Sequence, residues 1–355
     1  MKRLPNLDPL RFVLASIVVL FHIPQLSENQ GLPYLEGIPL FQKGTEAVYV
    51  FFVLSGFLII RLIYFKRQVG QFSIRKFYMR RILRIFPLYY LIFLFGIFFY
   101  HALLPFLGIN FEIKYSIEQA LFYNVFFLAN VFEKIYDPGG ILAVLWSIGI
   151  EEQFYILIAP ILFIIPVNRI LKGLGLIFFG YFILFHSELI PFLKIYRFVY
   201  FFLIAGGVVA ILEEEKRLKF LYSNKILPVF IVILNVIYFT TNWFVLENRF
   251  LYNLLSTLLF CLLIHTLAYN NIGKQIKNSI LNYLGRISYG IYMYHIIALN
   301  FSVFLILKVY ENKNLNDNLT IVLIYIMTFV LTIIMAHLSY KYFELKFLKI
   351  KNKFR

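Results

Sequence analysis

The sequence predicts an all-helical protein that crosses a membrane about ten times. Of its 355 residues, 61% are hydrophobic and 15% are charged, whereas soluble domains are about 45–50% apolar and about 25% charged. Long apolar runs recur along the whole chain, and each run is continuous, which favours membrane-spanning helices. A transmembrane β-barrel would instead alternate polar and apolar residues in segments of about ten, so the pattern excludes that fold.

Ten apolar segments are the candidates for these spans. A further apolar stretch at 117–131 is short for a span, so we expect it to form a re-entrant or interfacial helix. The spans are expected at about 7–27, 45–65, 87–107, 143–166, 172–188, 196–213, 226–244, 250–270, 287–309 and 318–342.

The basic residues predict the orientation of the chain. Most of the 34 lysines and arginines fall in loops that would face the cytoplasm if both termini lie inside, including the 66–84 cluster, Lys274 and Lys277. Cytoplasmic loops of membrane proteins carry such an excess. We therefore expect a multi-pass protein of the cytoplasmic (inner) membrane with both ends inside, in which residues 1–345 form the transmembrane domain and 346–355 a short basic cytoplasmic tail.

The segment at 71–86, QFSIRKFYMRRILRIF, mixes basic with apolar residues. This pattern predicts an amphipathic helix on the inner membrane surface that ends at Pro87. Arg81 and Arg84 would be neighbours on one face of this helix, and paired guanidinium groups suit bidentate binding of phosphate. The phosphate could belong to lipid headgroups or to a nucleotide-like ligand, and the residues alone leave both alternatives open.

The first span contains Arg11 and His22. Ionisable residues at membrane depth are costly and often mark a functional site. Eleven helical steps place the two about 16 Å apart along the axis and on nearly the same face. With Asp8 three residues before Arg11, they predict a two-ended site inside the membrane. Alternatively, Arg11 extends to the inner interface and His22 hydrogen-bonds a neighbouring helix.

Two adjacent carboxylates, Glu151 and Glu152, lie in the apolar segment LWSIGIEEQFYILIAP at 145–160. Buried carboxylates without partners are very unfavourable, so at least one should contact a cation or take up a proton. Counting along the helices places these residues roughly 12 Å, and His22 about 8 Å, below the outer surface. One glutamate could therefore meet His22, either for general-base or nucleophilic chemistry or simply to hold two helices together.

Other function classes find no support in the sequence. The net charge of +16 is explained by loops that face an anionic leaflet, and since no nucleic-acid-binding pattern is present, we expect no nucleic-acid partner. Cys261 is the single cysteine, and we expect it to be an inert apolar side chain. The histidines outside the first span show no metal-ligand spacing, so we expect no metal site. Tyr292 and His295 lie on the ninth span, where aromatic side chains more often pack or line the interface.

Five segments together resemble the membrane-bound acyltransferase-3 proteins, which O-acylate carbohydrates. LDPLR followed by His22 is similar to the opening Arg-x10-His motif of that family. The others are FFVLSGFLI at 51–59, RRILRIFPLYY at 80–90, LWSIGIEEQFY at 145–155 and GRISYGIYMYH at 285–295. The resemblance covers almost the whole chain and keeps the family's order. It departs at Phe12, where the family usually has Gly, and at Lys346, where Pro is usual.

The resemblance implies an O-acyltransferase that moves an acetyl or other short acyl group from cytoplasmic acyl-coenzyme A to a sugar hydroxyl at the cell surface. The implied partners are acyl-coenzyme A, which is a donor substrate rather than a permanently bound cofactor, the lipid bilayer, and a carbohydrate acceptor such as O-antigen, capsule or exopolysaccharide. The implied roles are catalysis for His22 and Glu151, donor binding for Arg11, Arg81 and Arg84, and acceptor binding or support for Asp8, Ser55, Trp146, Ser147, Glu152, Tyr155, Tyr292 and His295.

Other functions use the same buried charges. A transporter or flippase of lipid-linked sugars would need them along a substrate path, a polysaccharide polymerase would favour large outer loops, and a structural scaffold would not need His22. Within the acyltransferase hypothesis, His22 acts either as a base on the acceptor hydroxyl or as a covalent acyl carrier.

Overall fold

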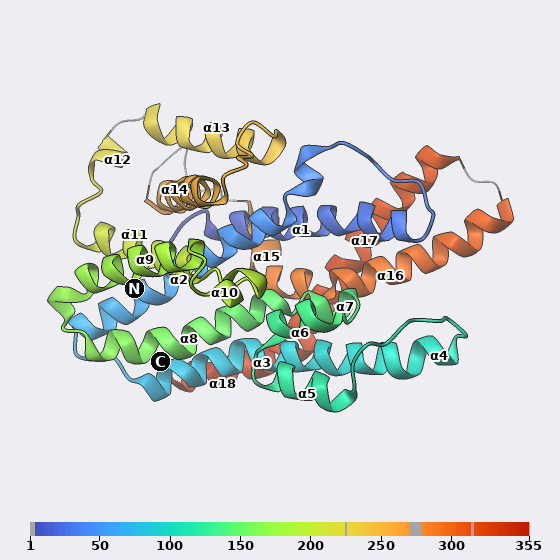
Figure 1. Cartoon of the computed structure of the whole chain (residues 1–355), viewed down its shortest axis with the longest axis horizontal. Coiled ribbons are helices and arrows are strands. Elements are labelled where there is room, and N and C mark those ends of the chain that lie inside the picture. The colour runs from blue at the N-terminus through green and yellow to red at the C-terminus, as the bar shows by residue number, and fades with distance from the viewer. Residues whose placement is uncertain (1–3, 224–225, 270–277, 314–315, 355) are drawn as a thin grey trace. The chain divides into compact units, whose positions relative to one another are not determined.

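The computed structural model is all-helical and describes residues 4–223, 226–269, 278–313 and 316–354 (Figure 1). Within these ranges, eight helices are long and apolar enough to cross a membrane. The predicted fold class, a polytopic helical membrane protein, is therefore confirmed. Lys274 and Lys277, on which part of the predicted orientation depends, lie outside the described residues, and the orientation stays a prediction.

The eight candidate spans account for most of the chain. Four of them continue beyond one regular helix: α3 and α17 each pass through a π-helical turn, α8 is preceded by the short α7 (Gly140–Ala143), and α9 is preceded by a 3-10 turn at Val167–Arg169. They are α1 (Leu7–Asn29), α2 (Gly44–Gln68), α3 (Ile74–Phe98) with α4 (Leu104–Phe106), α8 (Trp146–Ile164), α9 (Ile170–His186), α14 (Arg249–Tyr269), α16 (Ser288–Lys313), and α17 (Asp317–Ser339) with α18 (Leu345–Lys351).

Two of the ten expected spans are shorter than a membrane crossing requires. The segments at 196–213 and 226–244 contain α11 (Tyr200–Glu214) and α13 (Ile226–Thr240), each of 15 residues. At about 1.5 Å per residue, such a helix is about 22 Å long, which is less than the ~30 Å hydrocarbon core. The expected count of ten is therefore not confirmed for the described residues.

The prediction that a surface helix ends at Pro87 is wrong. The single helix α3 begins at Ile74, after Ser73 as its N-cap, and runs through Pro87 to Phe98. Proline removes one backbone donor and crowds the preceding turn, but membrane helices tolerate this interruption because neighbouring groups compensate it. The basic segment and the third span therefore form one continuous helix.

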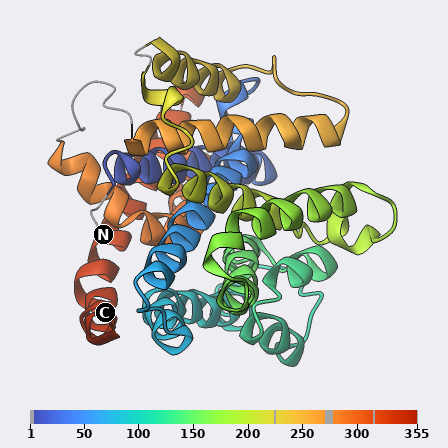
Figure 2. The same ribbon diagram turned by 90° about the vertical axis from the view of Figure 1, so that its left-hand side faces the viewer.

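Other elements differ from expectation in detail. The segment at 117–131 forms two short helices, α5 (Ile117–Val125) and α6 (Ala129–Tyr136), because Phe127 between them has a left-handed backbone with φ of 58°. The expected basic tail is helical at α18, which packs along α3 (Figures 1 and 2).

The chain divides into two compact units that share α2. The first contains residues 1–54 and 212–340, and the second contains 55–211 and 341–355. In the first unit, α1 packs against α15 (Ser279–Arg286) and α16, and α16 pairs with α17. Its apolar core includes Val19, Ile291 and Ile324. Gly285 allows α15 to approach α1 closely, because a Cβ there would lie 1.9 Å from the carbonyl oxygen of Asp8.

The second unit contains α3, α6, α8, α11 and α18, together with the C-terminal part of α2. Small residues bring α2 and α11 into contact, as is common between membrane helices. A Cβ on Gly56 would lie 1.8 Å from the carbonyl oxygen of Leu203, and one on Gly207 would lie 2.0 Å from Ile60. This contact fixes the part of α2 that carries Ser55.

Candidate active site

His22 on α1 and His295 on α16 form the central contact of the first unit. Nδ1 of His22 lies 3.2 Å from Nε2 of His295 and 2.9 Å from the carbonyl oxygen of Val18, one turn earlier on α1. Nδ1 of His295 in turn faces the carbonyl oxygen of Tyr292. His295 is fully buried, and His22 is partly exposed. The sequence predicted His295 as a supporting residue, and the structure supplies its partner.

These contacts fix the proton positions on both rings. A carbonyl oxygen can only accept a hydrogen bond, so Nδ1 of His22 and Nδ1 of His295 must each carry a proton. Nε2 of a neutral His295 is then the acceptor that faces the Nδ1–H of His22. Nε2 of His22 is left with its lone pair, and within the described part of the chain no hydrogen bond involves that atom. A bare imidazole nitrogen on a fixed ring can accept a proton or attack a carbonyl carbon.

Asp8 and Arg11 lie near the N-terminal end of α1, as predicted, on the same helix as His22. A guanidinium nitrogen of Arg11 lies 3.3 Å from a carboxylate oxygen of Asp8. Asp8 is buried beside Gly285, while the Arg11 side chain is 22% exposed. An ion pair offsets the cost of placing a cation among apolar helices. The ion pair and the imidazole therefore lie toward opposite ends of α1, and their function as one two-ended site stays a prediction.

In the second unit, Glu151 on α8 accepts two hydrogen bonds. Oγ of Ser55 donates to one carboxylate oxygen at 3.1 Å, and the hydroxyl of Tyr155 donates to the other at 2.7 Å. Both donors were predicted as supporting residues, although their link to Glu151 was not. Two such bonds stabilise a carboxylate in its ionised form. Glu151 and His22 belong to different units, so their predicted pairing stays a prediction.

Glu152 and Arg81 form the next part of this cluster. Glu152 is 4% exposed, and among the described residues none hydrogen-bonds its Oε1 atom. The Arg81 guanidinium lies within electrostatic range of Glu152 and above the Tyr155 ring, with its carbon 5.8 Å from the ring centroid. The half-buried Arg81 therefore supplies a cation of the kind that two adjacent acids require. Arg84 is exposed one turn further along α3, near enough to repel Arg81.

Trp146 and Ser147 are buried at the start of α8. The Arg197 guanidinium lies over the Trp146 ring at 5.1 Å from the centroid, and one of its nitrogens is 3.8 Å from a carboxylate oxygen of Glu133. Sequence reasoning missed Arg197, because it lies in a loop without a motif. Its backbone has φ of 54°, an uncommon value for a residue with a side chain, and no sequence pattern would reveal it.

Two histidines that looked isolated in the sequence have partners. Nε2 of His265 lies 2.9 Å from a carboxylate oxygen of Glu213, and Nδ1 of His337 lies 2.6 Å from the hydroxyl of Tyr283. Their partners are more than 50 positions away in sequence, which hides the pairing. Across the described ranges, no group of three or more His, Cys, Asp or Glu residues is placed to hold a metal ion.

The fold and these clusters define a multi-pass helical membrane protein with ionisable side chains gathered among its helices. A family model described as an acyltransferase domain matches residues 4–337, so the chain belongs to the acyltransferase-3 family. It shares 27% identity over 381 aligned positions with a Staphylococcus aureus (strain COL) protein that is provisionally named an O-acetyltransferase. That match covers 98% of this chain but only 58% of the relative.

Two further relatives are more distant or match less of the chain. A protein of Acidianus two-tailed virus, provisionally named an acetyltransferase, is 26% identical over 82% of each chain. An uncharacterized Haemophilus influenzae protein is 32% identical over 34% of this chain and 49% of its own length. No solved structure matches the chain.

Proposed function

We propose that this protein is an O-acyltransferase of the cytoplasmic membrane. It moves an acetyl or other short acyl group from cytoplasmic acyl-coenzyme A to a hydroxyl of a cell-surface polysaccharide or lipid-linked glycan. Membership of an acyltransferase family supports the reaction class. The names of the bacterial and viral relatives support acetyl as the group transferred.

The observation that carries the proposal is the Nε2 atom of His22, for which the described residues provide no hydrogen-bond partner. In the proposed reaction, this nitrogen takes the proton of the acceptor hydroxyl while that oxygen bonds to the thioester carbonyl carbon. The carbon–sulfur bond then breaks, and the leaving sulfur takes up the proton from His22. The carbonyl oxygen of Val18 and Nε2 of His295 both face the Nδ1–H of His22, so they stabilise the imidazolium that forms between these two steps.

The same nitrogen also fits a covalent route. Nε2 of His22 would attack the thioester directly, release coenzyme A and pass the acyl group to the acceptor from an acyl-imidazole. Because the proton on Nδ1 is held by Val18 and His295, both routes use the same atom. A burst of released coenzyme A in the absence of acceptor would distinguish the covalent route from direct transfer.

The other predicted residues take supporting roles in this proposal. Arg11, Arg81 and Arg84 supply cations for the phosphates of the donor. Glu151 is proposed as the essential carboxylate, held by Ser55 and Tyr155. Asp8 holds Arg11, and Glu152 balances the charge of Arg81. Acceptor binding is proposed for Trp146 and Ser147 at the start of α8, and Tyr292 positions His295 through its carbonyl oxygen.

The test is transfer of label from radiolabelled acetyl-coenzyme A into cell-envelope polysaccharide by membranes that contain the full chain. His22→Ala should lower incorporation at least 100-fold, since general-base catalysis contributes about 10²–10⁴-fold, and Glu151→Gln and Arg11→Ala should also lower it. His186→Ala is the matched control, because His186 makes the same bond to its own helix, Nδ1 to the carbonyl oxygen of Phe182 at 2.8 Å. Unchanged incorporation by His22→Ala would refute the catalytic role. No incorporation by the wild type, also with longer acyl donors, would favour a transporter.

A further inference from the structure

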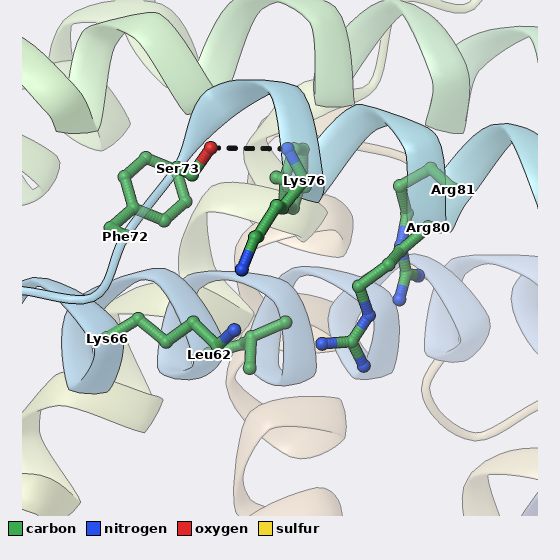
Figure 3. Close-up of a pocket in the computed structure, with 8 residues that line it drawn as sticks. Leu62, Lys66, Phe72, Ser73, Lys76, Arg80 and Arg81 are labelled. Atoms are coloured by element: carbon green, nitrogen blue, oxygen red, sulfur yellow. Dashed lines mark hydrogen bonds between the residues drawn. The ribbon is translucent and has the colours of Figure 1, made fainter. Parts of the chain in front are cut away.

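A pocket of about 310 Å³ lies between the end of α2 and the start of α3 in the second unit (Figure 3). Four of its lining side chains are cations: Lys66 from α2, and Lys76, Arg80 and Arg81 from α3. None of the described residues that line it is acidic. This volume includes open solvent, and the enclosed space is only large enough for a small group. The pocket therefore suits one charged group of a larger ligand, with the rest of that ligand lying outside it.

The cations face a common space. Figure 3 shows the ammonium groups of Lys66 and Lys76 directed toward one another from opposite helices, with the Arg80 guanidinium beside them. The charges of Lys76 and Arg80 are close enough to repel that of Lys66. Arg81 is likewise repelled by Arg80. Like charges gathered in one cavity disfavour the empty state, and a bound polyanion would relieve the repulsion.

We propose that this pocket binds the phosphorylated nucleotide end of the acyl donor, and that Lys66 and Lys76 recognise its ribose 3′-phosphate. The proposal rests on the proposed function, and it makes the chain selective for donors that carry this group. Coenzyme A has three phosphates, which match a cavity with four cations. A lipid headgroup with one phosphate would engage fewer of these cations than the three phosphates of coenzyme A. Phe72 also lines the pocket and presents an aromatic ring, on which an adenine base can stack.

The pocket adjoins the carboxylate cluster on α8. Arg81 lines the pocket and also lies over the Tyr155 ring, whose hydroxyl donates to Glu151. A nucleotide bound to Arg81 is therefore next to the residues proposed to support transfer. Arg81 was predicted as a donor ligand, whereas Lys66 and Lys76 were not predicted as site residues, because a basic loop also fits simple anchoring to lipid headgroups.

The test compares acetyl-coenzyme A with acetyl-dephospho-coenzyme A, which lacks only the 3′-phosphate. The purified full chain, in nanodiscs of phosphatidylcholine, should show a KM at least tenfold higher for the dephospho donor with a similar kcat, since the phosphate contributes binding that is equal in ground and transition states. Lys66→Gln/Lys76→Gln should raise the KM for acetyl-coenzyme A to that of the dephospho donor. The same variant should raise the KM for the dephospho donor much less than that for acetyl-coenzyme A.

Two control variants separate charge from structure. Arg75→Gln removes an exposed cation of α3 that does not line the pocket, and it should keep the wild-type preference. Lys66→Arg/Lys76→Arg keeps both charges and should preserve most of the preference for acetyl-coenzyme A. An unfolded protein would show no such preference, so this result would separate an effect of charge from an effect on folding.

Each outcome decides between the proposals. Equal use of both donors by the wild type overturns the 3′-phosphate site while leaving the acyltransferase intact. A glutamine variant that impairs both donors alike also overturns it. If the variant acts only when nanodiscs contain anionic phosphatidylglycerol, and does not change donor preference, the pocket holds lipid headgroups instead. Transfer from neither donor refutes the proposed function itself.

Discussion

Nδ1 of His22 lies 3.2 Å from Nε2 of His295, although the two residues are 273 positions apart in sequence. This contact and the carbonyl oxygen of Val18 hold one face of the His22 ring and leave Nε2 on the other side. His295 is in turn oriented by the carbonyl oxygen of Tyr292. In this pair, we propose that the imidazole of His22 carries out the chemistry, while the buried imidazole of His295 sets its orientation and proton position.

Replacement of His295 tests this positioning role. His295→Leu should lower kcat about 10- to 100-fold with little change in the KM for the acyl donor, because His22 keeps its nitrogen but loses an acceptor for its protonated form. His295→Gln, whose amide oxygen can accept from Nδ1–H, should retain more activity than the leucine variant. His337→Gln serves as control, since His337 pairs with Tyr283 away from the proposed chemistry. Equal loss of activity in the leucine and glutamine variants would contradict the positioning role.

The hydrogen bonds to Glu151 should contribute to stability as well as activity. Tyr155→Phe removes the donor at 2.7 Å and leaves a carboxylate oxygen without that partner. The expected loss is about 1–3 kcal/mol in the free energy of unfolding. Thermal unfolding in detergent, compared with that of Tyr90→Phe on α3, would measure it. An unchanged Tm for Tyr155→Phe would show that the bond is replaced by water or is not formed.

Close packing of α2 and α11 makes Gly56 intolerant of any side chain. A Cβ at this position would lie 1.8 Å from the carbonyl oxygen of Leu203, so Gly56→Ala should destabilise the protein by about 1–3 kcal/mol or more. Gly175→Ala on α9 is the matched control, because nothing lies within 4 Å of its added methyl group. It should be neutral or stabilise by about 0.5–1 kcal/mol, since alanine favours the helix. Similar melting temperatures for the two variants would refute the packing argument.

The buried His265–Glu213 pair is expected to be structural. Glu213→Gln should lower the melting temperature, because it weakens a bond to a side chain that is fully buried, while kcat and the donor KM stay at wild-type values. The readouts are thermal unfolding and acetyl transfer by the same preparation. A large fall in kcat without a fall in stability would instead assign this pair to the chemistry.

The sequence pattern predicts which side chains are neighbours on one helix. It is weaker at predicting contacts between side chains of helices that are far apart in sequence. The ion pair of Asp8 with Arg11, and the position of His22 on the same helix, could be anticipated because helical spacing fixes neighbours at three and four residues. The partner of His22 could not, because no spacing rule relates positions 22 and 295. For the same reason the link from Ser55 to Glu151 was hidden, although both residues were selected individually.

The misplaced boundaries have equally physical causes. Pro87 resembles a helix end, yet α3 passes through it, because the chain in a membrane keeps its helix where a soluble chain would often break it. The segment 226–244 was expected to span, and α13 ends at Thr240. The apolar composition of this segment indicates that it is buried or faces lipid, but composition alone does not determine where the helix ends.

The continuity of α3 through Pro87 has a consequence for the depth at which the protein sits. Five cationic residues lie between Ile74 and Arg84, and the remainder of the helix to Phe98 carries no charge. Moving one such cation into the hydrocarbon costs about 2.5–3.5 kcal/mol, which opposes a shift of α3 toward the membrane interior. Exposing the apolar half of the helix to water is also unfavourable, which opposes a shift in the other direction. On the predicted orientation, this distribution of charge would keep the cationic pocket at the membrane surface. The charged nucleotide of the acyl donor would then stay in contact with water throughout the reaction. Only the uncharged part of the donor that carries the acyl group would have to enter the bilayer.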